Sequence, residues 1–309
     1  MPNNSFNIQA TCNVCKTTDC KKLVDFTSDL DKEHYNVMKC KNCGLLFLYP
    51  LPNLTPQKLE QIYGEDYTET VYPDEQGKMD EDALNRQMEI VEKYVKVGRA
   101  LNIGAMGSEV RVIKNRGWNL TIVDASKYAL DRARKRGGVD ELYLSKIEDF
   151  SCPPGSYDFI KFGHVIEHLK DPAEVLLKLS QMLRPGGIIL VDTDNADGLE
   201  TRIEESIMKF MRMKIIRKSA EKLVGKKYNL RYGRLTPPVH LYTFTSKSLI
   251  ALTEKSGLKV LKSINSAWGD PTWFPTYNKS LVERMFIGID QVGLKFGKGN
   301  VIAVLAQKI

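Results

Sequence analysis

Short apolar segments alternate with helical patterns through the middle of the chain. Segments typical of buried strands lie at 100–103, 120–123, 142–144, 157–162 and 188–192. Helical patterns lie between them, at 109–116, 127–136 and 172–183. Each crossover between parallel strands needs a helix that covers the sheet. The alternation therefore predicts an α/β fold in which a parallel sheet carries helices on both faces.

Further elements flank this region. Apolar residues at helical spacing precede the first strand, namely Leu84, Met88, Val91 and Val95, and Gly98 is the expected stop. Later segments predict a helix at 245–256 and strands at 258–261 and 301–306. Nearer the N-terminus, a strand at 45–49 ends at Pro50. The chain thus divides into a lobe at 1–50, a connector with a helix at 51–98, and a main domain at 99–309.

Four cysteines in two pairs lie within the N-terminal lobe. The pairs are Cys12 with Cys15 and Cys40 with Cys43, and 24 residues separate them. Thiolates two residues apart turn onto one metal, so both pairs can hold a single Zn²⁺ tetrahedrally. Four protein ligands leave no open coordination position, so the ion would be structural and would stabilise a lobe too small to bury much core. We expect the residues between the pairs to form a hairpin with a loop.

Two disulfides or four free thiols are the alternatives to a zinc site. Residues 1–10 are polar and lack the apolar core of a secretory signal, which disfavours both alternatives and predicts a cytoplasmic protein. Cys20 and His34 lie between the two pairs and could replace a ligand, although we expect them to be bystanders.

Composition and charge add one basic segment to this picture. The 309 residues are 42% hydrophobic and 27% charged, and no run of about 18 apolar residues could span a membrane. The net charge is +7, and residues 199–231 hold ten Lys/Arg against four Glu. Apolar residues within 203–216 are spaced for an amphipathic helix. We therefore expect a basic helical insertion at 197–235.

Several functions are open to this insertion. It can be the solvated face of a segment that covers the substrate. It can also recognise an anionic substrate, such as a nucleotide- or diphosphate-linked sugar, or make a peripheral contact with an anionic membrane surface. Nucleic acid is the least favoured partner, because the segment lacks interleaved aromatic residues for base stacking.

A glycine-containing loop follows the first strand of the main domain. Residues 101–109 read LNIGAMGSE, where a strand turns into a helix and backbone N–H groups can meet a polar or anionic ligand. Asp124 ends the next strand, 20 residues after Gly104. A carboxylate at this position can accept hydrogen bonds from both hydroxyls of a ribose.

Three later motifs, in this order, resemble those of class I S-adenosylmethionine-dependent methyltransferases. They are GSYDFI at 155–160, HVIEHLKDP at 164–172 and LRPGGI at 183–188. The cysteine pairs, with CGLLFLYP at 43–50 and YGEDY at 63–67, resemble the zinc-bearing front end of a subgroup that includes sugar C-methyltransferases. The resemblance implies a Rossmann-like sheet of seven strands with a small N-terminal zinc-ribbon lobe.

The resemblance also implies a cofactor site for S-adenosylmethionine. Its methionine part would lie on Asn102, Gly104, Ala105 and Gly107. Its ribose would lie on Asp124 and Ala125, and its adenine beside Ile147, Glu148 and Asp149. The family usually has an acidic residue in place of Asn102 and glycines in place of Met106 and Ser108. An active enzyme is the leading hypothesis, and these departures motivate the alternative, a non-catalytic methyltransferase-like scaffold that binds a partner or nucleic acid through the basic segment.

Three of the four histidines fall at family positions that border the methyl-transfer cleft. Histidine is the side chain best suited to take a proton from a hydroxyl at neutral pH. We assign His240 as the general base, with His164 second, whereas His168 can be either catalytic or an imidazole hydrogen-bonded beneath the following helix. Of the tyrosine, glutamate and histidine that cluster in sugar C-methyltransferases, residues 236–242 retain only the histidine. We therefore expect O-methylation of a small sugar-containing or phosphorylated acceptor, with N-methylation also open.

Overall fold

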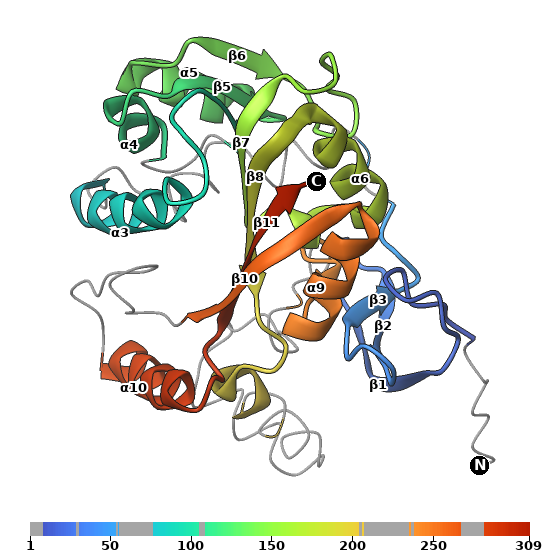
Figure 1. The fold of residues 1–309 in the computed structure, drawn as a ribbon. Coiled ribbons are helices and arrows are strands. Elements are labelled where there is room, and N and C mark those ends of the chain that lie inside the picture. Colours follow the sequence, from blue (N-terminus) through green and yellow to red (C-terminus); the bar gives the residue numbers. More distant parts are fainter. Residues whose placement is uncertain are drawn as a thin grey trace, which may run out of the picture.

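The computed structural model describes residues 9–28, 31–53, 55, 77–104, 109–203, 206, 235, 238–266 and 281–309. Most of the predicted basic insertion at 197–235 lies outside the described residues, as do residues 54 and 56–76 of the connector and loop residues 105–108. Two sheets organise the described part, a large one of seven strands and a smaller one of four (Figure 1).

The larger sheet has the strand order β10-β11-β8-β7-β4-β5-β6. Its strands are β4 (Arg99–Ile103), β5 (Asn119–Asp124), β6 (Glu141–Leu144), β7 (Tyr157–Gly163), β8 (Leu183–Asp194), β10 (Leu258–Ser266) and β11 (Val301–Lys308). The neighbours from β8 to β6 pair in parallel, whereas β11 pairs antiparallel with both β8 and β10. The prediction of a seven-stranded α/β sheet is confirmed.

Helices cover both faces of this sheet. One face carries α3 (Gly77–Val91), α4 (Glu109–Asn115) and α5 (Lys127–Arg136), and the other carries α6 (Pro172–Met182) and α9 (Ser246–Lys255) (Figure 1). Further helices include η2 (Ile166–His168) and α10 (Leu281–Lys295), and residues 199–203 are also helical. Helix α3 ends earlier than expected, at Val91, and the predicted helical residue Val95 is buried just beyond it.

Side-chain caps fix where the helices on the second face begin. Asp171 accepts hydrogen bonds from two backbone N–H groups at the start of α6, at 3.1 and 3.0 Å, and Pro172 opens the first turn. Thr245 and Ser248 form a reciprocal capping box at the start of α9.

The alternating faces of the strands divide the core into two clusters. In β4, Leu101 and Ile103 belong to the cluster beneath α6 and α9, whereas Ala100 belongs to the cluster beneath α3, α4 and α5. Because both faces are covered, these strands appear in the sequence as continuous apolar runs. The cluster beneath α6 and α9 continues into the N-terminal lobe and includes Val37 and Leu48.

The smaller sheet forms the N-terminal lobe and has the order β1-β2-β3-β9. Its strands are β1 (Cys20–Thr27), β2 (His34–Cys40), β3 (Leu46–Tyr49) and β9 (Tyr242–Thr243), all paired antiparallel. The expected hairpin is formed by β1 and β2. The fourth strand, β9, comes from the part of the chain that directly precedes α9, so the two sheets are joined through one segment.

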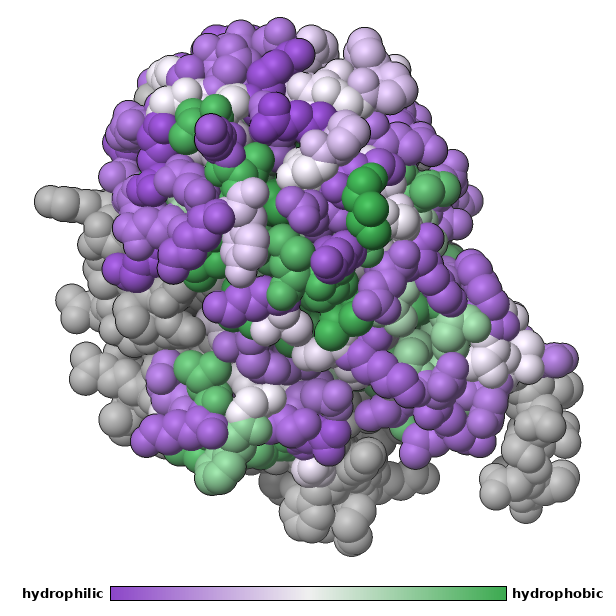
Figure 2. All heavy atoms as spheres, in the orientation of Figure 1, coloured by the Kyte–Doolittle hydropathy of each residue, from purple (hydrophilic) through white to green (hydrophobic). Residues whose placement is uncertain are grey.

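The face of the molecule drawn in Figure 2 is mainly polar. Hydrophilic side chains predominate on this face, and hydrophobic ones form small groups between them. Among the described residues, no helix combines the length and the apolar character needed to cross a membrane.

Candidate active site and tetracysteine cluster

The predicted site residues lie at the edge of the large sheet where the parallel strands end. Gly104 follows β4, Asp124 ends β5, and residues 147–149 follow β6. His164 follows β7. Parallel strands place all of their carboxyl ends on one edge, which is where ligands bind in open α/β sheets.

Gly104 begins the loop that leaves β4. Its φ of 93° lies in the left-handed region, which favours glycine, and its N–H donates to Val123 O at 2.9 Å. The nearest side-chain atom to a Cβ built on Gly104 would be Val165 Cγ2, at 3.7 Å. The loop therefore starts beside the segment that carries His164, so the predicted cofactor loop and the histidine segment are neighbours.

Asn102 is buried in β4 and contributes to the same turn. Its side-chain amide donates a hydrogen bond to Gly104 O. A carboxylate in this position has no N–H to donate, so the asparagine stabilises the start of the loop in a way that the acidic residue usual in the family could not. The neighbouring predicted residues Ala105 and Gly107 lie outside the described residues.

Asp124 lies at the end of β5 and shapes the next loop. Its Oδ1 accepts the N–H of Ser126 at 2.7 Å, and Ser126 in turn caps α5. The intervening Ala125 is exposed. The carboxylate is thus fixed at the edge of the sheet by a local turn, as a ribose-binding residue requires.

The predicted adenine-side residues combine a buried and an exposed part. Ile147 is buried, while Glu148 and Asp149 are exposed. Lys178, on α6, donates to the backbone carbonyls of Ile147 and Glu148 at 3.3 and 2.6 Å. These bonds connect the loop after β6 to the helix that follows the histidine segment.

His164 and Glu167 form an ion pair after β7. His164 has a φ of 49°, uncommon for a residue with a Cβ, and its Nδ1 lies 3.3 Å from Glu167 Oε1. Burial alone would lower the pKa of His164, but the hydrogen bond and charge of Glu167, with the charges of Asp192 and Asp194, raise it to about 9. Burial raises the pKa of Glu167, but the hydrogen bond from His164 and the neighbouring histidines lower it to about 2. Both groups are therefore charged at neutral pH.

A buried ion pair lies next to His164. Lys161 Nζ, on β7, is 2.9 Å from Asp192 Oδ2, on β8, and both side chains are more than nine-tenths buried. Asp192 Oδ1 lies 3.8 Å from His164 Nε2. The pair thereby connects the two central strands to the histidine segment.

His168 and His240 face each other from different parts of the chain. Their ring centroids are 4.6 Å apart in an edge-to-face arrangement. His168 Nδ1 lies 3.0 Å from Val239 O, so Nδ1 carries the proton of the neutral imidazole and Nε2 carries the lone pair. Burial and the neighbouring His240 lower the pKa of His168 to about 4, which keeps it neutral at physiological pH.

Glu167 joins the histidines into one cluster. Side-chain donor and acceptor atoms of Glu167, His168 and His240 all lie within 4.8 Å of one another. Oε2 of Glu167 is buried and accepts no hydrogen bond from the described residues. A carboxylate at this place can stabilise positive charge that forms on a neighbouring imidazole.

The structure adds charged residues that the sequence analysis did not assign. These are Lys161, Glu167, Asp192 and Asp194. For Lys161, Asp192 and Asp194, the available signal was a charged residue inside or close after an apolar strand segment, where a buried charge needs a partner. The partner itself could not be identified, because Lys161 and Asp192 lie on separate strands.

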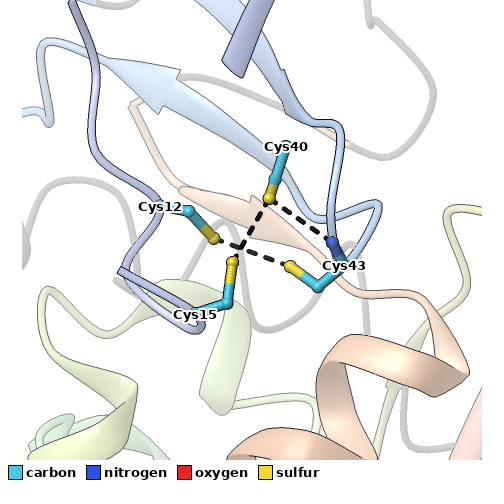
Figure 3. A group of neighbouring side chains, drawn as sticks. All are labelled: Cys12, Cys15, Cys40 and Cys43. Atoms are coloured by element: carbon cyan, nitrogen blue, oxygen red, sulfur yellow. Dashed lines mark hydrogen bonds between the residues drawn. The ribbon is translucent and has the colours of Figure 1, made fainter. Parts of the chain in front are cut away.

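The four lobe cysteines converge as predicted. Figure 3 shows their sulfur atoms turned toward one another from two separate turns of the chain. All four Sγ atoms lie within 4.8 Å of one another, with Cys12 and Cys43 at 3.6 Å and Cys15 and Cys40 at 3.4 Å. A disulfide requires about 2.0 Å. Sulfurs at the corners of a tetrahedron around Zn²⁺, each about 2.3 Å from the ion, lie about 3.8 Å apart. The cluster is therefore compatible with a small zinc lobe.

The two other candidate ligands are not part of the four-sulfur group, although Cys20 is the neighbour of Cys40 in the β1–β2 pairing. Cys20 Sγ is 3.8 Å from Thr17 O, and burial raises the pKa of its thiol to about 12. His34 is exposed at the far end of β2, where its Nδ1 lies 3.5 Å from Thr27 Oγ1.

The sheet order and the site at its carboxyl edge define an α/β methyltransferase fold. Residues 78–263 match the family described as a methyltransferase domain, and this region is more than half of the chain. The chain belongs to that family.

Curated relatives share part of this region. The ubiquinone biosynthesis O-methyltransferase of Aeromonas salmonicida is 33% identical over 103 residues, which cover 31% of this chain and 43% of that protein. The malonyl-[acyl-carrier protein] O-methyltransferase of Serratia marcescens is 31% identical over 90 residues, which cover 29% of this chain and 35% of that protein. The chain thus spans less than half the length of these relatives.

Among solved structures, the PH0226 protein from Pyrococcus horikoshii OT3 has the same fold. Its TM-score is 0.50 at 12% sequence identity, and the match covers 80% of this chain and 100% of that chain.

The charge of His164 should make the free energy of unfolding fall as the pH rises into the alkaline range. Because Glu167 raises the pKa of His164 from 6.5 to about 9, the stabilisation is complete below pH 6.5 and is lost as the pH rises through 9. We expect the loss of unfolding free energy in His164→Gln, measured by urea denaturation, to be largest below pH 6.5 and to shrink toward pH 9. In a Glu167→Gln background the same substitution should lose most of this dependence. A pH-independent difference in the wild-type background would contradict the assigned ion pair.

Proposed function

We propose that the chain is an active S-adenosylmethionine-dependent methyltransferase that methylates a hydroxyl of a small acceptor. One observation carries this proposal. The backbone of Gly104 lies beside Val165, and the side chains of Glu167 and His168, which follow Val165, gather with His240. We assign Gly104 and Asp124 to a cofactor half of the site, and Glu167, His168 and His240 to a proton-transfer half. A scaffold without activity needs the fold but has no use for half-buried histidines gathered around a buried glutamate at this edge.

The residues present fit the cofactor. Gly104 has no side chain to keep a ligand from its backbone, and Asp124 would supply the carboxylate for a ribose. Asn102, Ala105 and Gly107 would hold the methionine part, and Ala125, Ile147, Glu148 and Asp149 the adenosine. When bound, the cofactor supplies a methyl group already activated on a sulfonium.

His240 takes the proton of the acceptor hydroxyl in this proposal. His164 is less suited to be the base, because its raised pKa keeps it protonated at neutral pH. Glu167 supports proton transfer, since its carboxylate can stabilise the imidazolium that forms on His240. His168 holds the segment before His240 through Val239 O. Alignment of the methyl donor with the acceptor hydroxyl supplies the rest of the rate enhancement. Methyl transfer needs no covalent intermediate on the protein.

The acceptor in this proposal is small, hydroxylated, and sugar-containing or phosphorylated. The relatives named above as O-methyltransferases support transfer to oxygen. The basic residues within 197–235 support an anionic acceptor, or a peripheral contact with anionic lipid in the cytoplasm, through their charge alone.

In the lobe, we propose that Cys12, Cys15, Cys40 and Cys43 hold one structural Zn²⁺. The sulfur separations and the chemistry of four thiolates support this assignment.

Binding of the product cofactor separates an enzyme from a scaffold. We expect calorimetric titration with S-adenosylhomocysteine to give a micromolar dissociation constant or better. Asp124→Ala should weaken binding by about tenfold or more, because the ribose loses a charge-assisted acceptor worth roughly 1.5–3 kcal/mol. Asp131→Ala, at an exposed carboxylate on α5, is the matched control and should change nothing. Absence of binding at millimolar ligand would favour the scaffold.

Removal of the base should affect turnover rather than cofactor binding. We expect His240→Ala to lower kcat by roughly 10²–10⁴-fold for acceptors found by screening sugars and sugar phosphates, with S-adenosylhomocysteine affinity unchanged. His34→Ala, at an exposed position in the lobe, should keep wild-type turnover. Full turnover in His240→Ala would show that another group accepts the proton.

The metal can be measured directly. We expect elemental analysis to find one zinc per chain, Cys43→Ser to lose it, and chelation to lower the thermal midpoint of the wild type. Cys152→Ser, in the main domain, and Cys20→Ser should retain the metal. A folded wild-type protein without metal would refute the site.

A further inference from the structure

The lobe and the active site share one short segment of chain. Strand β9 pairs with β3 through Phe47 with Tyr242 and Leu46 with Thr243. The N–H of Leu48 donates to Leu241 O at 3.0 Å, which extends this pairing toward His240. His240 is thus the residue directly before a segment that the lobe holds along its backbone.

Both cysteine turns also bond to this segment through side chains. Asn13, between Cys12 and Cys15, donates its amide to the hydroxyl of Tyr242. On the second turn, Cys43 O accepts the hydroxyl of Thr245 at 2.7 Å. The proposed metal would order both turns, and each turn holds one end of the segment 242–245.

The opposite side of the segment holds the histidine loop. The N–H of Leu241 donates to Glu167 O at 2.8 Å, and His168 Nδ1 donates to Val239 O at 3.0 Å. The hydroxyl of Tyr242, which accepts from Asn13, donates to Lys170 O at 3.0 Å. Tyr242 is 1% exposed, so its hydroxyl is fixed between the first cysteine turn and the loop that follows His168.

We infer that the tetracysteine lobe sets the geometry of the acceptor half of the active site, and that Tyr242 is the positioning residue that connects them. The contacts join the lobe to His168, Glu167 and His240. The cofactor half, with Gly104 and Asp124, is held by bonds within the large sheet and its own loops. Loss of the metal or of the Tyr242 hydroxyl therefore displaces the two facing histidines and leaves the cofactor half in place. The inference rests on the proposed function only where it treats the histidines as part of an active site.

The chain has four histidines, so the signal of each imidazole can be followed by nuclear magnetic resonance to test the connection. In zinc-loaded full-length protein with ¹⁵N-labelled histidine, we expect Tyr242→Phe to shift the imidazole signals of His168 and His240 and to leave that of His34 in place. Tyr35→Phe is the matched control, because Tyr35 is also buried but donates its hydroxyl to Asp31 within the lobe. It should move only the signal of the adjacent His34. Unchanged His168 and His240 signals in Tyr242→Phe would overturn the inference.

Metal removal gives the second arm of the test. Chelation should shift the same two signals, and added zinc should restore them, while the dissociation constant of S-adenosylhomocysteine stays within about twofold. Loss of S-adenosylhomocysteine binding on chelation would overturn the inference, because the lobe would then support the whole domain. Absence of binding in the untreated wild type would refute the proposed function, whereas the histidine signals would still report on the connection.

Discussion

Parallel pairing from β8 to β6 is the constraint on which the candidate site depends. Parallel strands that share a sheet end on the same edge, so the loops that leave them meet whatever their distance in sequence. Gly104, Asp124 and His164 become neighbours for this reason alone. The antiparallel β11 lies beside β8 and begins at this edge, where Val301 pairs with Asp194. The residues that lead into β11 therefore also reach the edge, and the N–H of Asn195 donates to Asn300 O at 2.7 Å.

Buried charge is the second organising feature. Removing a charge from water costs several kcal/mol, and a partner with good geometry is needed to offset this cost. Glu167 and Asp192 are both almost fully buried, and each has a cationic partner, His164 and Lys161. Removing one partner of such a pair is strongly destabilising, because it leaves an uncompensated charge in the interior. The positive φ of His164 fits this account, because the backbone adopts a less favourable conformation where the paired charges fix it.

Much of the fold could be predicted from the sequence because its signals are local. Apolar runs gave the strands, helical spacing gave the helices, and two cysteine pairs gave the cluster in the lobe. The end of α3 was missed because Val95 continues the helical spacing and is buried although the helix has stopped. The carboxyl-edge residues Gly104, Asp124 and His164 could be placed because motif order follows strand order.

Other features depend on pairs of residues that the sequence does not connect. Strand β9 has two residues, too few for any periodic pattern, and only its partner β3 makes it a strand. The charge state of His164 depends on Glu167 and on two aspartates of another strand. The role of Asn102 depends on the hydrogen bond that its side chain donates to Gly104 O. The order of residues along one sequence does not reveal this bond.

The bond between Thr245 and Cys43 O joins residues 202 positions apart, and this separation has a consequence for the order of folding. During synthesis the cysteine turns and the β1–β2 hairpin emerge first and can close on a metal through contacts within about 30 residues. The edge of β3 then stays without its partner until β9 has been made, because non-local pairing must wait for the intervening chain. An unpaired strand edge invites association with other chains, so the nascent protein is most prone to aggregate in the interval before β9 emerges.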